Sequence, residues 1–406
     1  MKKITNYFGQ FHKMVWVLLI GTVLARGSSF MTLPFLSIYL SRNMDLPPII
    51  IGLTVGMSPL MGTVGGFIGG NLSDRFGRKR IMLISVLSIA IVFYCFTIAK
   101  SQVMFILLNA LNGLCNSCFE PISQALMADL TDKKKRMKVY SLRYTAINIG
   151  ASVGPLIGAY FANHSAKLSF FITGSTYFLY AIALFYFMNK ISITTGENKK
   201  ESVTFRDAFS IVKKDMALRY LILGIILVNI GYVQIDSNLP QHLDHVLKNG
   251  VTMFSFLISI NAIMVVLLQL PVSHFAEKFK PMQMMVVGAI FISGGLVGFS
   301  FVNGWAIAII SIFLITLGEI LIFPANSILI DRLAPDHLRG TYFGAGQFRK
   351  IGSFAGPIIG GYFLSNVNGQ IMFWVISIIT LCSIFFFQIG NRSYMKRQEL
   401  HKETSI

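Results

Sequence analysis

Apolar blocks of about 20 residues, almost free of charged side chains, recur along the whole chain. Because a helix rises 1.5 Å per residue, such a block is about 30 Å long, the thickness of the hydrocarbon core of a bilayer. Only 13% of the 406 residues are charged, against about 25% in soluble domains, which is too few to coat a soluble surface. We therefore expect a polytopic helical membrane protein. A soluble enzyme, a secreted disulfide scaffold and a disordered chain are excluded.

The spacing of these blocks predicts an all-α membrane protein with twelve transmembrane helices in two six-helix bundles. A polar linker, 190–217, separates the bundles, and its amphipathic segment Phe205–Val212 favours a surface helix. The predicted domains are an N-terminal bundle (1–189), a C-terminal bundle (218–390) and a cytoplasmic tail (391–406). The predicted spans are 14–40, 48–70, 81–99, 103–128, 140–163 and 168–189, then 218–240, 251–273, 284–302, 305–331, 341–364 and 370–390.

The net charge of +18 is distributed as a membrane topology signal rather than as a nucleic-acid surface. With the N-terminus inside, the cytoplasmic segments hold about 27 Lys and Arg and the outer loops about four. The outer four are Arg42, Lys100, Lys167 and Lys248. We therefore expect a multi-pass protein of the bacterial cytoplasmic membrane with both termini in the cytoplasm, and no nucleic-acid partner.

The two halves of the chain repeat each other at a nearly constant offset. Pro121 corresponds to Pro324, 203 positions later, and Gly154–Phe161 corresponds to Gly356–Phe363, 202 positions later. Such a repeat indicates a duplicated six-helix unit. Two pseudo-symmetric halves around a central cavity are the architecture of an alternating-access transporter, with its site between the halves at mid-membrane.

The segment Gly69–Arg80, GGNLSDRFGRKR, joins the second and third predicted helices. It resembles the signature loop of the major facilitator superfamily, which implies that fold over essentially the whole chain. The resemblance also implies a latch that closes the inner face, with Arg78 paired to Asp129 and Asp74 near the N-terminus of the eleventh helix. A pure topology signal is the alternative interpretation of the basic cluster. The implied gate residues are Gly70, Asp74, Arg75, Gly77, Arg78 and Asp129.

Gly150, Gly154, Pro155 and Gly158 in the fifth predicted helix resemble a motif of the drug/proton antiporter branch of that superfamily. Their spacing places the glycines on one helix face, where they allow close backbone approach. Plain helix packing is the alternative, because the eleventh helix repeats the pattern. An arginine that this branch carries in the fourth helix is replaced here by Asn109, so its proton-relay role is not carried over.

Five charged residues inside the predicted spans are the candidate proton-coupling and substrate residues. An intramembrane charge costs about 2.5–3.5 kcal/mol on insertion scales, so each suggests a function. A carboxylate there can exchange a proton and, once ionised, hold a lipophilic cation. Two alternatives are that Glu120 only neutralises an arginine and that Asp236 is a solvated helix end. The five residues are Glu319, Asp236, Glu120, Arg26 and Arg143.

The sequence around Asp236 and around Glu319 resembles bacterial multidrug antiporters of the LmrP type. The resemblance implies that these two acids serve proton coupling and the binding of cationic drugs. A third acid of that type, early in the fifth helix, is not matched, and the neighbouring position here is Arg143.

The cavity between the halves is predicted to be apolar and adaptable, because Met and aromatic side chains suit varied ligands. The candidate wall residues are Met31, Phe35, Met57, Met61, Tyr144, Tyr232, Phe323, Tyr342 and Phe348.

No nucleotide-binding, zinc or serine-hydrolase motif is present, so we expect a non-enzymatic carrier with no cofactor and no metal site. The His242–His245 spacing is interpreted as a solvated loop. The predicted function is secondary active efflux: inward protons are exchanged for lipophilic, often cationic, drugs or toxic compounds. The partners are then a small-molecule substrate, protons and the lipid bilayer, around a monomer. Two rivals remain: a carrier of one defined solute (an anionic metabolite, siderophore or lysolipid), which the arginines favour, and a transport-inactive sensor.

Overall fold

The computed structural model describes residues 11–132, 135–190, 205–276, 278–335 and 338–403. Within these ranges the chain is helical and contains no strand. Eleven of the described helices are long and apolar enough to cross a membrane. The predicted class, an all-α membrane protein, is confirmed.

The N-terminal half packs around a buried cluster of aromatic rings, in which Phe96 lies 5.5 Å from Phe105 and 5.4 Å from Phe170 between ring centroids. These residues come from three different helices, so the cluster ties them into one core. The helices are α2 (Lys13–Thr32), α3 (Leu36–Met44), α4 (Pro48–Phe76), α5 (Arg78–Ile98), α6 (Gln102–Asp129), α7 (Arg136–His164) and α8 (Ala166–Asn189), with the 3-10 turn η1 (Leu33–Phe35).

The C-terminal half has a second core, which also takes in Phe35, Ile38 and Ala159 from the N-terminal half. Its first helix, α9, lies in the predicted linker where a surface helix was expected. The helices are α9 (Phe205–Lys214), α10 (Met216–Tyr232), α11 (Gln234–Ser237), α12 (Leu239–Val246), α13 (Gly250–Ala276), α14 (Pro281–Ser300), α15 (Trp305–Leu333), α16 (Arg339–Ala345), α17 (Lys350–Asn366) and α18 (Gly369–Glu403), with the 3-10 turn η4 (Gly346–Arg349).

Three predicted spans are interrupted in the structure. The first breaks at η1, which contains Pro34, and the seventh breaks into α10, α11 and α12. The span 341–364 divides into α16, η4 and α17, and α17 alone is 17 residues long. Proline removes a backbone donor and glycine weakens a helix, which explains the breaks at Pro34 and at Gly344–Gly346. The predicted eleventh span is therefore a broken helix rather than a continuous one.

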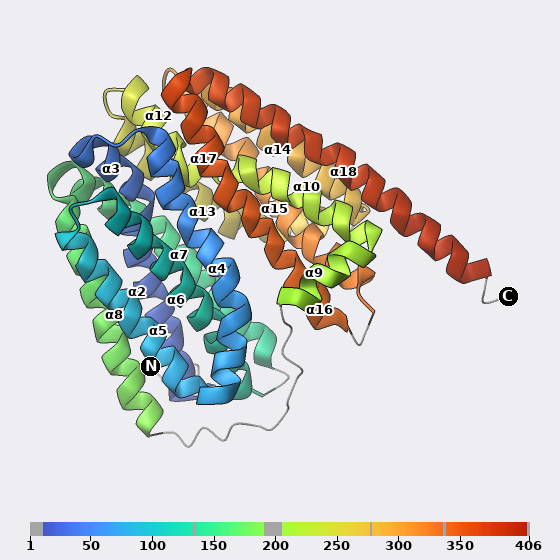
Figure 1. Ribbon diagram of the computed structural model, residues 1–406, viewed down its shortest axis with the longest axis horizontal. Helices are drawn as coiled ribbons and strands as arrows, with labels where there is room; N and C mark the ends of the chain where they lie inside the picture. Colours follow the sequence, from blue (N-terminus) through green and yellow to red (C-terminus); the bar gives the residue numbers. More distant parts are fainter. Residues whose placement is uncertain (1–10, 133–134, 191–204, 277, 336–337, 404–406) are drawn as a thin grey trace.

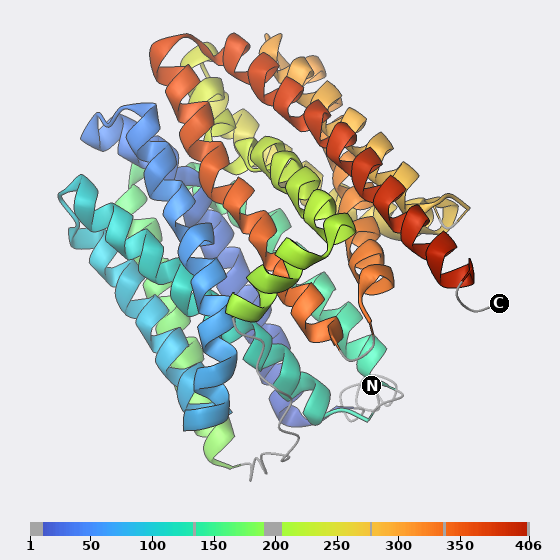
Figure 2. The same ribbon diagram turned by 45° about the vertical axis from the view of Figure 1, so that its right-hand side comes forward.

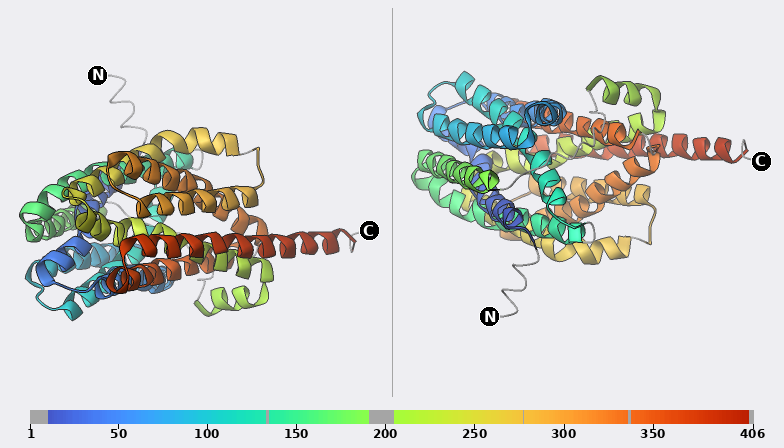
Figure 3. Two further views of the ribbon diagram at one scale, coloured as in Figure 1. Left: turned by 90° about the horizontal axis from the view of Figure 1, so that it is seen from above. Right: turned by 90° about the horizontal axis from the view of Figure 1, so that it is seen from below.

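The last helix extends beyond its predicted end. The sequence predicts a span at 370–390 followed by a tail, whereas α18 runs as one helix from Gly369 to Glu403. After Gly390 the chain has no further glycine or proline and is rich in helix formers, so nothing ends the helix there. Its C-terminal part projects past the rest of the molecule (Figure 3).

The two halves meet at the end that carries α3 and α12 and spread apart toward the end that carries α9 and α16 (Figures 1 and 2). We call these the α3 end and the α9 end. The contacts between the halves run mainly along α4 with α17 and along α7 with α13.

Glycines let the helices of the α4–α17 seam touch backbone to backbone at the α3 end. A Cβ atom added to Gly52 would lie 2.1 Å from the carbonyl oxygen of Pro357, and one added to Gly361 would lie 2.4 Å from that of Pro48. Both contacts are between the two halves and involve main-chain atoms, which cannot give way as a side chain can.

Replacing Gly52 by Ala should force the halves apart at the α3 end, because the new methyl group would overlap the Pro357 carbonyl. We expect faster hydrogen–deuterium exchange in the first turns of α4 and in α17 than in the wild type. Gly66→Ala is the matched control on the same helix, since an added Cβ there meets no atom within 4 Å. Unchanged exchange in Gly52→Ala would contradict this role of the seam.

Candidate functional site

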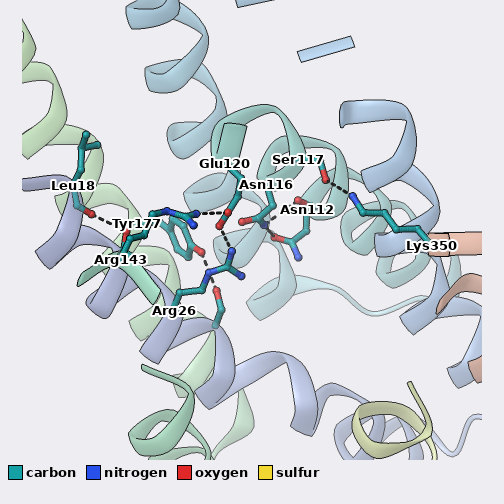
Figure 4. Close-up of polar contacts among 11 residues, drawn as sticks. Leu18, Arg26, Asn112, Asn116, Ser117, Glu120, Arg143, Tyr177 and Lys350 are labelled. Carbon is teal, nitrogen blue, oxygen red and sulfur yellow. Dashed lines mark hydrogen bonds and ion pairs between the residues drawn. The ribbon is translucent and has the colours of Figure 1, made fainter. Parts of the chain in front are cut away.

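Three charged side chains from three helices of the N-terminal half form one ion-pair cluster. Arg26 of α2 donates to one carboxylate oxygen of Glu120 on α6, and Arg143 of α7 donates to the other (Figure 4). The glutamate thus neutralises two arginines at once, and the cluster keeps one net positive charge. Beside it, the hydroxyl groups of Tyr177 and Ser29 are hydrogen-bonded at 2.9 Å.

A row of polar side chains continues from this cluster along α6. Asn112, Asn116 and Glu120 are spaced four residues apart and therefore share one helix face. The Asn116 amide donates to the side-chain oxygen of Asn112 at 2.9 Å (Figure 4). The row lies in a membrane-spanning helix, where polar side chains are costly unless they are partnered.

Lys350 reaches this row from the other half of the molecule. It begins α17, and its ammonium group lies 3.3 Å from the carbonyl oxygen of Gly62 on α4 and 3.5 Å from the Ser117 hydroxyl on α6 (Figure 4). Among the described residues no carboxylate lies within ion-pair distance of it. Lys350 is not among the site residues predicted from the sequence.

Glu319 of α15 is held by neutral partners in the C-terminal half. The Asn261 amide of α13 donates to its carboxylate at 3.0 Å and to the Thr316 hydroxyl at 2.9 Å. Tyr232 of α10 interacts with the same carboxylate, and its ring lies edge-on to Phe323 at 5.2 Å. Within the described part of the chain, Glu319 has no ion-pair partner.

The guanidinium group of Arg349 contacts an aromatic ring rather than a described carboxylate. It stacks over the ring of Phe323, 5.5 Å from the ring centroid, and forms no ion pair with a described carboxylate. A cation over an aromatic face is favourable in a site with few waters. Arg349 therefore already occupies a face of the Phe323 ring that could bind another cation.

Asp236 lies between the two halves. The helix break before α11 places it on a cavity of about 230 Å³, where its carboxyl group and Arg26 line the same space from opposite halves. The remaining lining comes from α2, η1, α3, α4, α6 and α17 and from Val233 at the helix break, and it includes Asn109 and Ser353. The structure thus places Asp236 in a cavity rather than at a solvated helix end.

A second hollow, of about 450 Å³, brings two of the predicted wall residues beside Glu319. Glu319, Tyr144 and Phe323 line it together with Gln269 and Pro324. Tyr232 contacts Phe323 from behind. Met57 and Met61 are half-buried on α4.

The other four wall candidates pack elsewhere. Met31 and Phe35 are buried, and Phe35 lies 5.5 Å from the ring of Phe254 at the contact between the halves. The Tyr342 hydroxyl donates to the Asp215 carboxylate at 2.6 Å, and Phe348 lies edge-on to Phe205 of α9 at 5.2 Å. Tyr342 and Phe348 thus contact α9 and the residue that follows it.

The predicted gate residues lie at the α9 end of the N-terminal half. Gly70, Asp74 and Arg75 belong to the last turns of α4, and their side chains are outside the described part of the structure. Gly77 ends α4 with a φ of 86°, a conformation that favours glycine. Arg78 forms an ion pair with Asp129, as the motif implied.

The glycines of the antiporter-like motif all face α2. Added Cβ atoms would lie 2.6 Å from the Gly27 nitrogen at Gly150, 2.4 Å from the Gly27 oxygen at Gly154, and 2.4 Å from the Met31 oxygen at Gly158. Pro155 lies inside the same helix. The motif therefore brings α7 against the helix that carries Arg26.

His242 is not in a solvated loop, contrary to the prediction. It belongs to α12, is 4% exposed and lies edge-on to Phe373 at 5.2 Å. Burial lowers the pKa of His242 to about 4, so the side chain is uncharged at neutral pH. The described residues contain no group of three metal-ligating side chains.

An ion pair fastens the two halves at the α3 end. The Arg42 side chain, at the end of α3, donates to Asp244 of α12 with a distance of 2.8 Å from its Nε atom, and to Asn163 of α7 at 3.3 Å. The sequence counted Arg42 only as an outer-loop charge. Arg42 and Asp244 are 202 positions apart, the same offset as the internal repeat, and this signal could have paired them.

Comparison with known proteins gives a family match over most of the chain. The model of the Major Facilitator Superfamily matches residues 18–350. The uncharacterized MFS-type transporter YqjV of Bacillus subtilis (strain 168) is 34% identical over 396 residues, covering 96% of this chain and 97% of that protein. A Na(+), Li(+), K(+)/H(+) antiporter of Planococcus maritimus is 26% identical, covering 84% and 87%. The multidrug resistance protein MdtG of Salmonella typhi is 25% identical, covering 94% and 95%.

Solved structures with the same fold include peptide and nucleoside transporters. A peptide transporter POT superimposes with a TM-score of 0.78 at 16% identity, over 94% of this chain and 95% of the other. The nucleoside transporter NupG superimposes with a TM-score of 0.77 at 12% identity, over 93% and 100%. At these identities the likeness concerns the fold.

Proposed function

Because this chain belongs to the Major Facilitator Superfamily, we propose that it is a proton-coupled antiporter that exports lipophilic compounds carrying a positive charge. Glu319 and Asp236 would be the groups that take up a proton or the cationic substrate in turn. The transport itself would proceed by alternating access between the two halves.

One observation carries the proposal: two carboxylates line the space between the halves without a described cationic partner. Glu319 is bonded to an amide, and Asp236 faces a cavity. An ionised carboxylate is costly in a low-dielectric site unless something neutralises it. A proton and a lipophilic cation can each do this, and they then compete for the same oxygen atoms.

The surroundings of Glu319 suit an apolar ligand. Tyr144 and Phe323 lie beside the acid, and the hollow they line is large compared with one carboxyl group. Aromatic surfaces of this kind accept varied apolar shapes. One relative is named a multidrug resistance protein, which supports drugs as substrates, and another is named a Na(+), Li(+), K(+)/H(+) antiporter, which supports exchange of a cation for protons.

The energy available to such an exchange is adequate. A one-for-one exchange of a proton for a monovalent cation moves no net charge, so the pH difference alone drives it, and each pH unit supports about a tenfold substrate gradient. With a second proton one net charge crosses, which at 100 mV adds about 2.3 kcal/mol, or roughly forty-fold at about 1.4 kcal/mol per decade.

The predicted topology puts the α9 end in the cytoplasm, together with both termini. The basic side chains of that end, such as Arg78, Lys79 and Lys213, support this orientation. The seam at the α3 end would then close the outer face, and the structure would correspond to a cytoplasm-facing state of a monomer.

The decisive experiment uses purified protein in inside-out liposomes with an acidic lumen. We expect uptake of ethidium against its gradient, together with a matching rise of the luminal pH. An ionophore that collapses the pH gradient should stop the uptake. Failure of the folded protein to accumulate ethidium, with the pH gradient intact, would contradict the proposal.

A second candidate is exchange of an alkali-metal ion for protons, which the cation/proton antiporter among the relatives favours. The same vesicles test it when sodium ions replace ethidium as the external cation. Luminal alkalinisation by sodium ions without any by ethidium would favour this candidate over export of lipophilic cations.

A further inference from the structure

The charged side chains that contact the polar row of α6 include more bases than acids. Arg26 and Arg143 bind Glu120, Lys350 lies near Ser117, and Glu120 is the one described carboxylate that pairs with any of these bases. We call these three bases and Glu120 the α6 wall; Arg26 is its member that lines the cavity. The Arg26–Glu120–Arg143 cluster uses both oxygens of its acid and still keeps one positive charge. Lys350 adds a second, so the wall has two positive charges in excess.

Lys350 is the least compensated of these bases. Its ammonium group has three donors, and its described partners are a carbonyl oxygen and a hydroxyl group at 3.3 and 3.5 Å. These distances are long for hydrogen bonds to an ammonium group, which are typically about 2.7–2.9 Å with an ionised acceptor. A charged lysine in a membrane site costs several kcal/mol, so neutral and distant partners leave it available to a better acceptor.

The position of Lys350 connects it to the cavity that Arg26 lines. Ser353, one helical turn further along α17, lines that cavity, and so do Ser58 and Pro59, one turn before Gly62 on α4. Lys350 and its partner Gly62 therefore lie directly below the cavity, toward the α9 end. Arg26 and Asp236 line the same cavity.

We propose that Lys350 and the Arg26–Glu120–Arg143 cluster form an anion-binding subsite, so that the transported compound carries an anionic group as well as a positive one. The inference rests on the proposed function, because the positive group would bind Glu319 or Asp236 on the opposite wall. The compounds bound most tightly are then amphoteric and lipophilic, and a simple lipophilic cation is a weaker substrate.

The chemistry of the two walls explains why both charges matter. A carboxylate or phosphate group next to Lys350 would replace the Gly62 carbonyl and the Ser117 hydroxyl with a charged acceptor. Hydrogen bonds to ionised acceptors are shorter and stronger than those to neutral ones. A purely cationic compound gains nothing from this wall and is repelled by its excess charge.

The test compares two forms of one dye in direct binding to purified protein. A rhodamine methyl ester is a cation, and the corresponding free acid adds a carboxylate to the same chromophore. Fluorescence polarisation gives the dissociation constant of each. We expect the wild type to bind the free acid more tightly than the ester, and Lys350→Gln to weaken binding of the free acid by about tenfold, with little change for the ester.

Matched variants separate the charge from the packing. Lys350→Arg keeps the positive charge and should keep the preference for the free acid. Arg26→Gln removes one charge from the other side of the wall while Glu120 stays paired with Arg143, and it should also reduce the preference. Equal losses for both dyes in Lys350→Gln, or a wild type that prefers the ester, would overturn the subsite.

The dye-binding measurement on purified protein does not depend on proton coupling, whereas the uptake measurement in vesicles does. The subsite and the antiport can therefore be refuted independently. Absence of proton-driven uptake with the preference for the free acid intact would refute antiport and leave the subsite standing. Proton-driven uptake of the ester with no preference for the free acid would refute the subsite alone.

Discussion

Glu319→Gln should abolish uphill transport while it leaves downhill exchange intact. The variant keeps the shape of the side chain and its bond to Asn261, but it can no longer release or accept a proton at that position. Without the exchange of a proton for substrate, the gradient of protons cannot be converted into a gradient of substrate. We therefore expect accumulation in acid-lumen vesicles to fall to the level of empty liposomes.

The measurement needs both modes in the same vesicles. Uptake against the gradient measures coupling to protons. Exchange of labelled for unlabelled substrate at equal concentrations shows whether the protein still carries substrate across the membrane. Asp132→Asn is the matched control, since Asp132 is an exposed carboxylate just after α6, outside both cavities and outside the predicted gate residues. Uphill uptake that survives in Glu319→Gln would show that another group carries the proton.

The second large effect concerns stability. Glu120→Gln should destabilise the protein by about 3–5 kcal/mol, because it leaves two partly buried arginines without a counter-charge. Arg143→Gln breaks one of the same two ion pairs but leaves Glu120 bound to Arg26. It should therefore cost clearly less than the change at Glu120.

Unfolding by a denaturing detergent, followed by far-UV circular dichroism, would measure the difference. The double variant Glu120→Gln with Arg143→Gln should lose less stability than the sum of the two single changes, since it removes one of the stranded charges. Equal costs for the two single variants would contradict a shared acid between the arginines.

The sequence predicted most of the fold because its two strongest signals are physical necessities. A span needs about 20 apolar residues, and a backbone in lipid must be helical, so the existence of the helices follows directly. Interruptions within spans are harder to predict, since the effect of Pro34 or of Gly344 and Gly346 depends on which neighbours take over the backbone hydrogen bonds. Tertiary packing decides this, not local composition.

The acidic residues of the candidate site could be predicted from the sequence, but the contacts that these residues make could not. Glu319, Asp236 and Glu120 stood out because charges are scarce inside the spans. Asn261 gave no such signal, because a neutral amide is common in helices. The contact of Lys350 with Gly62 depends on how the two halves pack. The sequence of α17 alone does not determine this packing.

The aromatic and methionine residues show the same limit. A chain with 35 phenylalanines and 19 methionines offers many candidates for a wall, and composition cannot tell which face of a helix looks inward. Phe323 and Tyr144 line the hollow at Glu319, whereas Phe348 packs on α9. Phe348 packs against the amphipathic helix α9 and therefore does not line the hollow at Glu319.

The ion pair between Arg42 and Asp244 carries information about how this protein arose. The two residues occupy equivalent positions of a duplicated unit, and they meet where the two copies face each other. In an ancestral homodimer each such residue would have faced its own copy, because a two-fold interface pairs identical surfaces. Arginine facing arginine, or aspartate facing aspartate, would have repelled. Opposite charges at this point require two copies that differ in sequence, as the two halves joined in this chain do. The ion pair is thus an asymmetry that fusion permits, and it commits each half to its own partner.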